Sequence, residues 1–168
     1  FIACDSKGII HSGRENLDIS KQKLLEFTNL ENQTGTLQDA VLGADVFLGV
    51  SAAGVLTEDM VRTMGKDPII FAMANPTPEI MPELAKKAGA CIIGTGRSDY
   101  PNQINNVLAF PGIFKGVLKY RKTQITDLMK IRAAEALAVY ISDPDEDHIL
   151  PNPLDKGVVD VICEAMKD

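Results

Sequence analysis

The sequence of 168 residues is long enough to bury the core of one domain, and acidic residues outnumber basic ones by 23 to 17. The net charge of −6 disfavours nucleic acid and anionic membrane surfaces as partners, although a small anion can still bind in a local pocket. The most apolar stretch, residues 40–56, contains Asp45 and three glycines, so no segment is predicted to cross a membrane.

The three cysteines, Cys4, Cys91 and Cys163, are far apart in the sequence and lack C-x-x-C spacing. Their odd number and wide separation favour free thiols in a reducing compartment over a disulfide framework. We therefore predict a cytoplasmic protein.

Short apolar runs alternate with segments of helical periodicity over the first part of the chain. Apolar strands separated by helices are typical of a parallel sheet, and the spacing suits right-handed β-α-β crossovers. The predicted fold class is therefore α/β, a Rossmann-like doubly wound parallel sheet. The expected strands are residues 1–4, 46–50, 69–72 and 91–93, and the expected helices are residues 21–27, 37–42, 58–64 and 82–88.

Capping residues define two of these helix boundaries more closely. Thr36 with Asp39 three positions later is typical of a capping box, and Gly43 is suited to follow the end of that helix. Thr57 is suited to cap the next helix, with Glu58 close to its positive end.

The pattern becomes helical after the fourth strand. Residues 105–119 predict a helix that is interrupted or begins near residues 110–112, and residues 123–141 predict a long amphipathic helix. An acidic, proline-containing loop at 142–155 precedes a last helix at 156–166. We therefore expect a C-terminal helical segment over residues 123–168.

Residues 1–5 read as the end of a buried strand, so we expect a domain truncated at its N-terminal edge, without its first β-α-β element. In a doubly wound nucleotide-binding fold, an acid at the end of the second strand accepts hydrogen bonds from the adenosine ribose. Asp5 fits that position, and an ordinary acidic turn residue is the alternative. Lys7, Lys21 and Lys23 can instead favour a 2′-phosphate, so the choice between NAD and NADP stays open.

Two further strands end in small or amide residues. Gly49, Val50 and Ser51 follow one strand, where small residues let the backbone approach a flat ligand, although packing or turn roles are equally common for glycine. Asn75 follows the next strand between Ala74 and Pro76. Its amide can both donate and accept towards a nicotinamide or a carboxylate, with an Asx turn as the alternative.

Residues 94–112 form the segment richest in neutral polar groups. Its donors suit a dicarboxylate that also chelates a metal, and a polar loop that caps a helix is the alternative. The other candidates for metal ligands, His11, His148 and the acids of the 142–155 loop, lack ligand spacing and are interpreted as surface or structural residues. The hydrogen-bond donors of the segment 94–112 are Arg97, Asn102, Gln103, Asn105 and Asn106.

Together these segments resemble the malic enzyme family. The strings DSKGIIHSGR, GADVFLGVSAAGVLT, PIIFAMANPTPEI, GTGRSDYPNQINNVLAFPGIFKG and ILPNPLD stand in the family's order and spacing. The resemblance covers nearly the whole chain and is closest to the shorter bacterial type.

The resemblance implies oxidative decarboxylation of L-malate to pyruvate, with reduction of NAD or NADP and a requirement for Mg or Mn. It also implies that Asp5 contacts the adenosine ribose, that Asn75 lies beside nicotinamide and malate, and that Asn106 is the stronger of two malate contacts. The cofactor-binding residues implied are Asp5, Gly49, Val50, Ser51 and Asn75, and the substrate-binding residues implied are Asn75, Asn105 and Asn106.

The resemblance further implies that the catalytic Tyr and Lys, the acidic metal ligands and the phosphate loop lie before Phe1; the sequence has no G-x-G-x-x-G. We accordingly predict no catalytic residue and no metal ligand in this chain, which alone should be inactive. Residues 1–168 are predicted to be one incomplete NAD(P)-binding domain. The complete enzyme is expected to be a homo-oligomer.

Three alternatives remain open. A malolactic enzyme shares the substrate and releases lactate, and another dinucleotide-dependent enzyme shares the α/β pattern without both NPTPE and the NQINN–FPG segment. A non-catalytic nucleotide-binding or regulatory module is the alternative from a different class. The sequence of the natural gene tests this last alternative. An enzyme requires that the gene encode an upstream domain with the catalytic Tyr and Lys.

Overall fold

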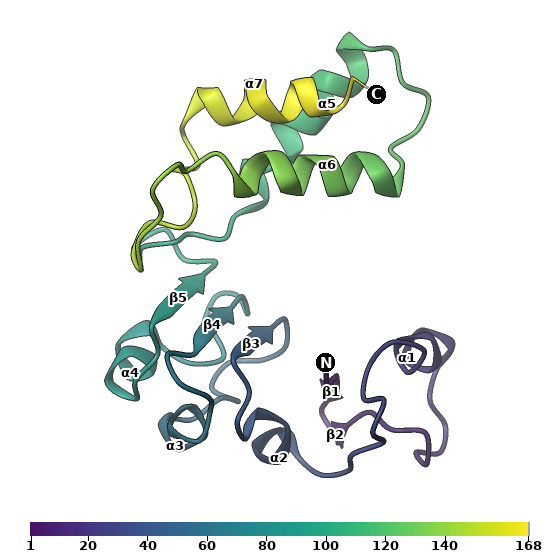
Figure 1. Ribbon diagram of the computed structural model, residues 1–168, viewed down its shortest axis with the longest axis vertical. Coiled ribbons are helices and arrows are strands. Elements are labelled where there is room, and N and C mark those ends of the chain that lie inside the picture. Colours follow the sequence, from purple (N-terminus) through teal and green to yellow (C-terminus); the bar gives the residue numbers. More distant parts are fainter. Residues whose placement is uncertain (168) are drawn as a thin grey trace.

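The computed structural model describes residues 1–167 and has three parts. Figure 1 shows a small sheet covered by short helices, a separate layer of longer helices, and an N-terminal hairpin beside the first helix. The elements in chain order are β1 (Cys4–Asp5), β2 (Gly8–Ile9), α1 (Ile19–Leu24), α2 (Leu37–Val41), β3 (Val46–Gly49), α3 (Glu58–Arg62), β4 (Ile69–Ala72), α4 (Pro82–Lys87), β5 (Ile92–Thr95), the 3-10 turn η1 (Asn106–Leu108), α5 (Phe110–Lys119), α6 (Asp127–Ala138) and α7 (Lys156–Ala165).

The parallel sheet has the order β3-β4-β5. Helices α2, α3 and α4 cover one of its faces (Figure 1), and alternate residues of β3 point to opposite sides. Phe47 is buried towards the helices, whereas Val46 and Leu48 on the other face are 51% and 60% exposed. The buried core between sheet and helices consists of Val41, Phe47, Leu56, Val61, Met64, Ile70, Ala72, Ile80, Ala85 and Ala90.

The short helices begin where their capping residues predict. The Thr57 hydroxyl accepts a hydrogen bond from the Met60 N–H at 3.2 Å. The Asp39 carboxylate accepts from the N–H and the hydroxyl of Thr36, at 2.7 and 2.8 Å. Both side chains satisfy groups that a helix N-terminus leaves without intrahelical partners, so the predicted starts of α2 and α3 are confirmed.

The N-terminal segment differs from its prediction. Residues 1–4 were expected to form a buried strand, but Phe1 is 98% exposed and β1 pairs antiparallel with β2. The chain turns directly after Asp5, whose carboxylate accepts from the Lys7 N–H at 2.9 Å. Gly8 completes the turn with a φ of 98°, a conformation that favours glycine. The hairpin reaches the rest of the fold through β2, where the Ile9 N–H donates to the Gly35 carbonyl at 2.8 Å.

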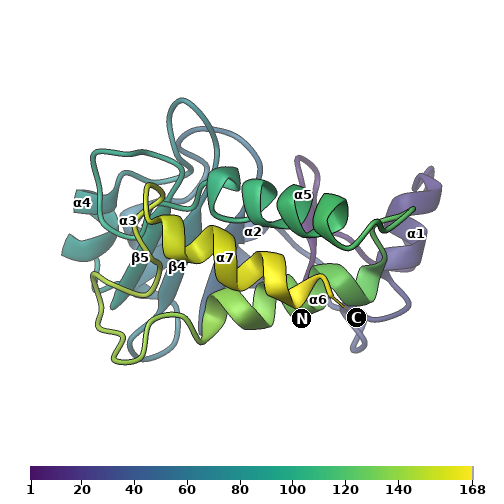
Figure 2. The same cartoon turned by 90° about the horizontal axis from the view of Figure 1, so that it is seen from above.

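The three C-terminal helices form a second core. Helix α7 packs against both α5 and α6, and Figure 2 shows the three lying side by side. Two glycines of α5 allow the close approach: a Cβ on Gly116 would lie 2.6 Å from the Cys163 carbonyl oxygen, and one on Gly112 would lie 2.6 Å from the Ile162 Cβ. The Cys163 side chain is buried at this contact. The buried residues of this core are Met129, Ala133, Val158, Ile162 and Met166.

The prediction of one long amphipathic helix at 123–141 is wrong in two respects. Helix α6 is shorter, because it begins after the N-cap Thr126 and ends at Ala138. Its apolar residues also point in two directions: Met129 is buried in the second core, whereas Leu128 and Ile131 are 53% and 54% exposed. For residues 105–119, the predicted alternative of a helix that begins near residue 110 is confirmed, since α5 starts at Phe110 after the separate turn η1. None of the helices in residues 1–167 has the length and apolar character needed to span a membrane.

Candidate dinucleotide and substrate site

Three strands of the parallel sheet end at one common edge. Gly49, Ala72 and Thr95 are aligned across β3, β4 and β5. The Met73 N–H extends this alignment by donating to the Gly49 carbonyl at 3.0 Å. The end of β3 and the residues that follow β3 and β4 are therefore neighbours, which places Gly49, Val50, Ser51 and Asn75 at one edge of the sheet.

Three of the candidate residues at this edge are exposed to solvent. Val50 is 76% exposed, and Ser51 and Asn75 are also exposed. Within residues 1–167, the Asn75 side chain makes no hydrogen bond to another residue, so its amide is free to donate to and accept from a ligand. Ligands of open α/β sheets bind outside the carboxyl ends of the strands, and this edge is such a place.

Glu79 is a residue of this edge that the sequence analysis missed. Its side chain is fully buried, and its carboxylate accepts hydrogen bonds from Ser51 after β3 and from Ala74 after β4. The one signal in the sequence was its position between two apolar residues, Pro78 and Ile80. The structure shows both of these neighbours to be buried. The partner Ser51 lies 28 positions upstream, a relation that local sequence does not reveal.

The segment after β5 folds back beside that strand. Residue Gln103 forms a parallel bridge with Thr95, and the Ile104 N–H donates to the Thr95 carbonyl at 2.8 Å. Gly94 leaves room for this return, since a Cβ there would lie 2.9 Å from side-chain atoms of both Ile104 and Phe71. The path places Asn105 and Asn106 directly after the returning segment, at the start of η1.

The donors predicted for this segment do not form one set. Asn102 is buried, its Nδ2 donates to the carbonyls of Ile93 and Glu146, and its Oδ1 accepts from the Ile149 N–H at 2.8 Å. The interpretation of Asn102 as a ligand donor is therefore wrong: its amide joins β5 to the acidic loop. Arg97 pairs with Asp99 through two hydrogen bonds of 2.9 and 2.6 Å.

The two predicted malate contacts differ in how they are held. The Asn105 Oδ1 accepts from the Val107 N–H at 3.0 Å and thereby caps η1. Asn106 is exposed, and within residues 1–167 its side chain makes no hydrogen bond to another residue. The Nδ2 donors of both residues lack a partner within residues 1–167, but only Asn106 is exposed and leaves its whole amide open to a ligand.

Asp5 lies in the hairpin and is already saturated with donors. Its Oδ1 accepts from Arg14 and from the Lys7 N–H, and its Oδ2 accepts from Arg14 and from Lys21, all at 2.8 to 2.9 Å. A carboxylate has about four acceptor positions, so a ribose hydroxyl would have to displace one of these donors. The hydrogen bonds from Arg14 and Lys21 hold the pKa of the Asp5 carboxyl well below its usual range. Ribose binding by Asp5 stays a prediction.

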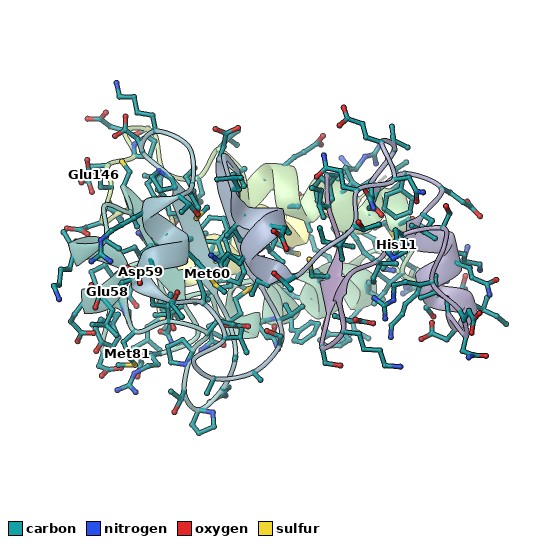
Figure 3. All side chains as sticks on the ribbon, turned by 90° about the horizontal axis from the view of Figure 1, so that it is seen from below. His11, Glu58, Asp59, Met60, Met81 and Glu146 are labelled. Atoms are coloured by element: carbon teal, nitrogen blue, oxygen red, sulfur yellow. The ribbon has the colours of Figure 1, made fainter. Side chains whose placement is uncertain are left out.

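The described residues do not fit a divalent metal site. Residues 1–167 contain no group of three or more His, Cys, Asp or Glu side chains arranged around a common point. His11 lies at one end of the molecule and Glu58 and Asp59 at the other (Figure 3), and the His11 Nδ1 accepts a local hydrogen bond from the Gly13 N–H at 3.2 Å.

A parallel sheet with an exposed amide and small residues at its carboxyl edge is typical of dinucleotide-binding α/β domains, in agreement with the fold class predicted from the sequence. The family model described as "Malic enzyme, NAD binding domain" matches residues 1–161. The chain belongs to this family.

Relatives of known name agree with this assignment. The bifunctional malic/malolactic enzyme of Bacillus subtilis is 54% identical over 169 residues, which cover 99% of this chain and 41% of that protein. The NAD-dependent malic enzyme of Geobacillus stearothermophilus is 46% identical, over 99% of this chain and 35% of the relative. The crystal structure of the NAD-dependent malic enzyme of Thermotoga maritima matches with a TM-score of 0.94 and 43% identity, over 99% of this chain and 44% of that one. The chain thus spans about two fifths of the length of these proteins.

Proposed function

We propose that this chain is the NAD(P)-binding part of an enzyme that converts L-malate and NAD(P)+ to pyruvate, carbon dioxide and NAD(P)H. The observation that carries the proposal is the shared carboxyl edge of β3 and β4, where Val50, Ser51 and the free amide of Asn75 meet, in a chain that matches the malic enzyme NAD-binding family over residues 1–161. The bound cofactor supplies the hydride acceptor, and the protein binds and orients it.

The residues of this chain would act by binding and orientation. Asn75 offers a donor and an acceptor to the nicotinamide carboxamide, and Asn106 offers an N–H donor to a malate carboxylate. Neutral amides hold an anion without placing a second full charge beside the reacting carbon. The proton-transfer groups and the metal ligands are expected in the part of the enzyme that this chain does not include.

The direct test is an assay of the complete protein with L-malate, Mn²⁺ and either NAD+ or NADP+. We expect pyruvate and reduced cofactor to form in equal amounts, and the better nucleotide identifies the cofactor preference. If neither pyruvate nor lactate forms, the proposal fails and a non-catalytic nucleotide-binding module takes its place.

A second candidate activity is the malolactic reaction, which converts L-malate to lactate and carbon dioxide without net reduction of the cofactor. The specific support is the relative named a bifunctional malic/malolactic enzyme, with which the chain shares 54% identity. Lactate formed without accumulation of NAD(P)H in the same assay would establish it.

The role of Asn106 can be tested apart from cofactor binding. Because its exposed amide makes no hydrogen bond within residues 1–167, Asn106→Ala should leave the fold and the affinity for NAD(P)+ unchanged. The kcat/KM for L-malate should fall about tenfold or more, since a hydrogen bond to a charged group contributes about 1.5–3 kcal/mol. An unchanged kcat/KM would remove Asn106 from the substrate site.

Two further properties of the complete protein belong to the same proposal. A homo-oligomer is expected by likeness to the family, and light scattering of the complete protein measures the stoichiometry. A cytoplasmic location agrees with the three free thiols of Cys4, Cys91 and Cys163. Fractionation of the source cells tests the location.

A further inference from the structure

Glu79 is an acid buried without a cationic partner among the described residues. It lies in the turn after β4, and its relative exposure is 0%. The carboxylate Oε1 accepts from the Ser51 N–H at 2.7 Å and from the Ser51 hydroxyl at 3.2 Å, and Oε2 accepts from the Ala74 N–H at 2.9 Å. All three donors belong to the loops at the carboxyl edge of the sheet.

Such an arrangement is costly for the stability of a fold. A carboxylate that leaves water loses a large hydration free energy, and neutral N–H donors restore only part of it. Even buried ion pairs can often be replaced by apolar side chains of similar volume with no loss of stability. The stability of the core therefore does not by itself account for an acid at residue 79.

The carboxylate does what no apolar side chain can do, because it joins two loops that follow different strands. Ser51 ends the segment Gly49, Val50, Ser51, and Ala74 directly precedes Asn75. One planar group with an oxygen on each loop fixes the distance between the two cofactor-binding candidates. Backbone hydrogen bonds strengthen the link, since the Leu56 N–H donates to the Glu79 carbonyl at 3.0 Å.

The sequence at residue 49 also serves this carboxylate. A Cβ on Gly49 would lie 2.5 Å from the Glu79 Cδ and 2.7 Å from its Oε1. The position directly beneath the carboxylate thus has to be glycine for Glu79 to occupy its present place. The glycine at the end of β3 is consequently explained by Glu79 in addition to any contact with a ligand.

We propose that Glu79 is a positioning residue for the dinucleotide: its carboxylate holds the Val50–Ser51 backbone and Asn75 at the spacing that the cofactor requires. This inference rests on the proposed function, because it takes the sheet edge to be the cofactor site. Glu79 itself does not touch the cofactor.

Glu79→Gln in the complete enzyme is the sharpest variant. Glutamine has nearly the same size, but it offers an oxygen to one loop and an NH₂ group to the other. An NH₂ group that faces the N–H of Ser51 or Ala74 cannot form the native hydrogen bond, so one loop is released while the core stays filled. Titration with NAD(P)H, followed by the fluorescence of the reduced cofactor, measures the effect on binding.

We expect Glu79→Gln to raise the Kd for NAD(P)H at least tenfold. The matched control is Val61→Ala, which removes buried volume from α3 on the covered face of the sheet and lowers Tm without touching either loop. Its Kd for NAD(P)H should stay within twofold of the wild-type value. If Glu79 only stabilised the fold, Glu79→Gln and Val61→Ala would raise the Kd for NAD(P)H by the same factor whenever they lower Tm by the same amount.

A Kd for Glu79→Gln within twofold of wild type overturns the inference. If Glu79→Gln does not fold, Glu79→Asp takes its place with the same two outcomes, because it keeps both acceptors but is one methylene too short to reach both loops. Wild-type enzyme that fails to bind NAD(P)H overturns the proposed function instead, so the two failures are distinguishable.

Discussion

Two carboxylates, one in the N-terminal hairpin and one at the edge of the sheet, are held in opposite ways. Asp5 is partly exposed and is surrounded by the cationic side chains of Arg14 and Lys21. Glu79 is fully buried and receives only the N–H groups and the hydroxyl of two loops. One acid is neutralised by charges on flexible side chains, and the other is solvated by the backbone.

The difference teaches which of the two acids can rearrange. Lys and Arg side chains near the surface can turn away into water at small cost, so Asp5 can exchange a donor for a ligand. The N–H groups around Glu79 are fixed by β3 and β4, so its carboxylate defines a geometry that does not adapt. Salt, pH and mutation should therefore affect the two regions differently.

The largest effect should come from crowding the Glu79 carboxylate. In Gly49→Ala the new Cβ would lie within 2.7 Å of Glu79 and of the Phe47 ring, and neither is free to move. We expect a loss of about 2–3 kcal/mol in the free energy of unfolding, measured by urea unfolding of the complete protein. Gly96→Ala is the control, because a Cβ there meets nothing closer than 3.9 Å. Equal stability of the two variants would contradict the inference that the surroundings of the Glu79 carboxylate are rigid.

A smaller effect, dependent on pH, is expected at the hairpin. Asp5→Asn removes both ion pairs and should cost about 2 kcal/mol at pH 7. Because the native fold lowers the pKa of Asp5, the carboxylate stabilises the fold above the unfolded pKa of about 3.9, and this contribution is lost as the pH falls towards the lower native pKa.

Urea unfolding of wild type and Asp5→Asn at pH 7 and at pH 3 tests this sign. The gap between their free energies of unfolding should shrink at the lower pH. A gap that stays constant would mean that the charge on Asp5 contributes nothing and that only its shape matters.

The smallest effect should come from Lys21→Gln. The bidentate pair of Arg14 with Asp5 remains, and the Lys21 side chain is 35% exposed, so only a small loss in the free energy of unfolding is expected at low salt. In 1 M salt, where the screening length is about 3 Å, the loss should vanish. Lys23→Gln serves as the control, since Lys23 forms no ion pair within residues 1–167. A loss of stability that persists in high salt would mean that Lys21 and Asp5 form a desolvated ion pair. This would contradict the view that Asp5 is held by side chains that can turn into water.

Local sequence predicted the elements that local chemistry determines. The starts of α2 and α3 follow from Thr36 and Thr57, whose hydroxyls form hydrogen bonds with residues three positions further on. Strands β3, β4 and β5 follow from apolar runs, and their parallel order follows from the helices between them. The placement of Asn75 after β4 needed nothing beyond that order.

Relations over longer distances were not predictable in the same way. Glu79 looks like a surface acid in the sequence, and its burial depends on Ser51, which belongs to another strand. Asn102 looks like a ligand donor, but its partners Glu146 and Ile149 lie more than 40 residues further on. The apolar run at the N-terminus was predicted to be a buried strand. In the structure its last residue belongs to β1, which pairs with β2 in a hairpin that turns at Gly8.

The glycines of α5 have a consequence for experiments on the helical layer. They bring the α5 backbone against α7 so closely that no space is left around Cys163, whose relative exposure is 1%. A thiol reagent can reach this sulfur only when the two helices separate. The rate of labelling at Cys163 thus reports how often the helical layer opens, in a chain that has no tryptophan to reveal it by fluorescence.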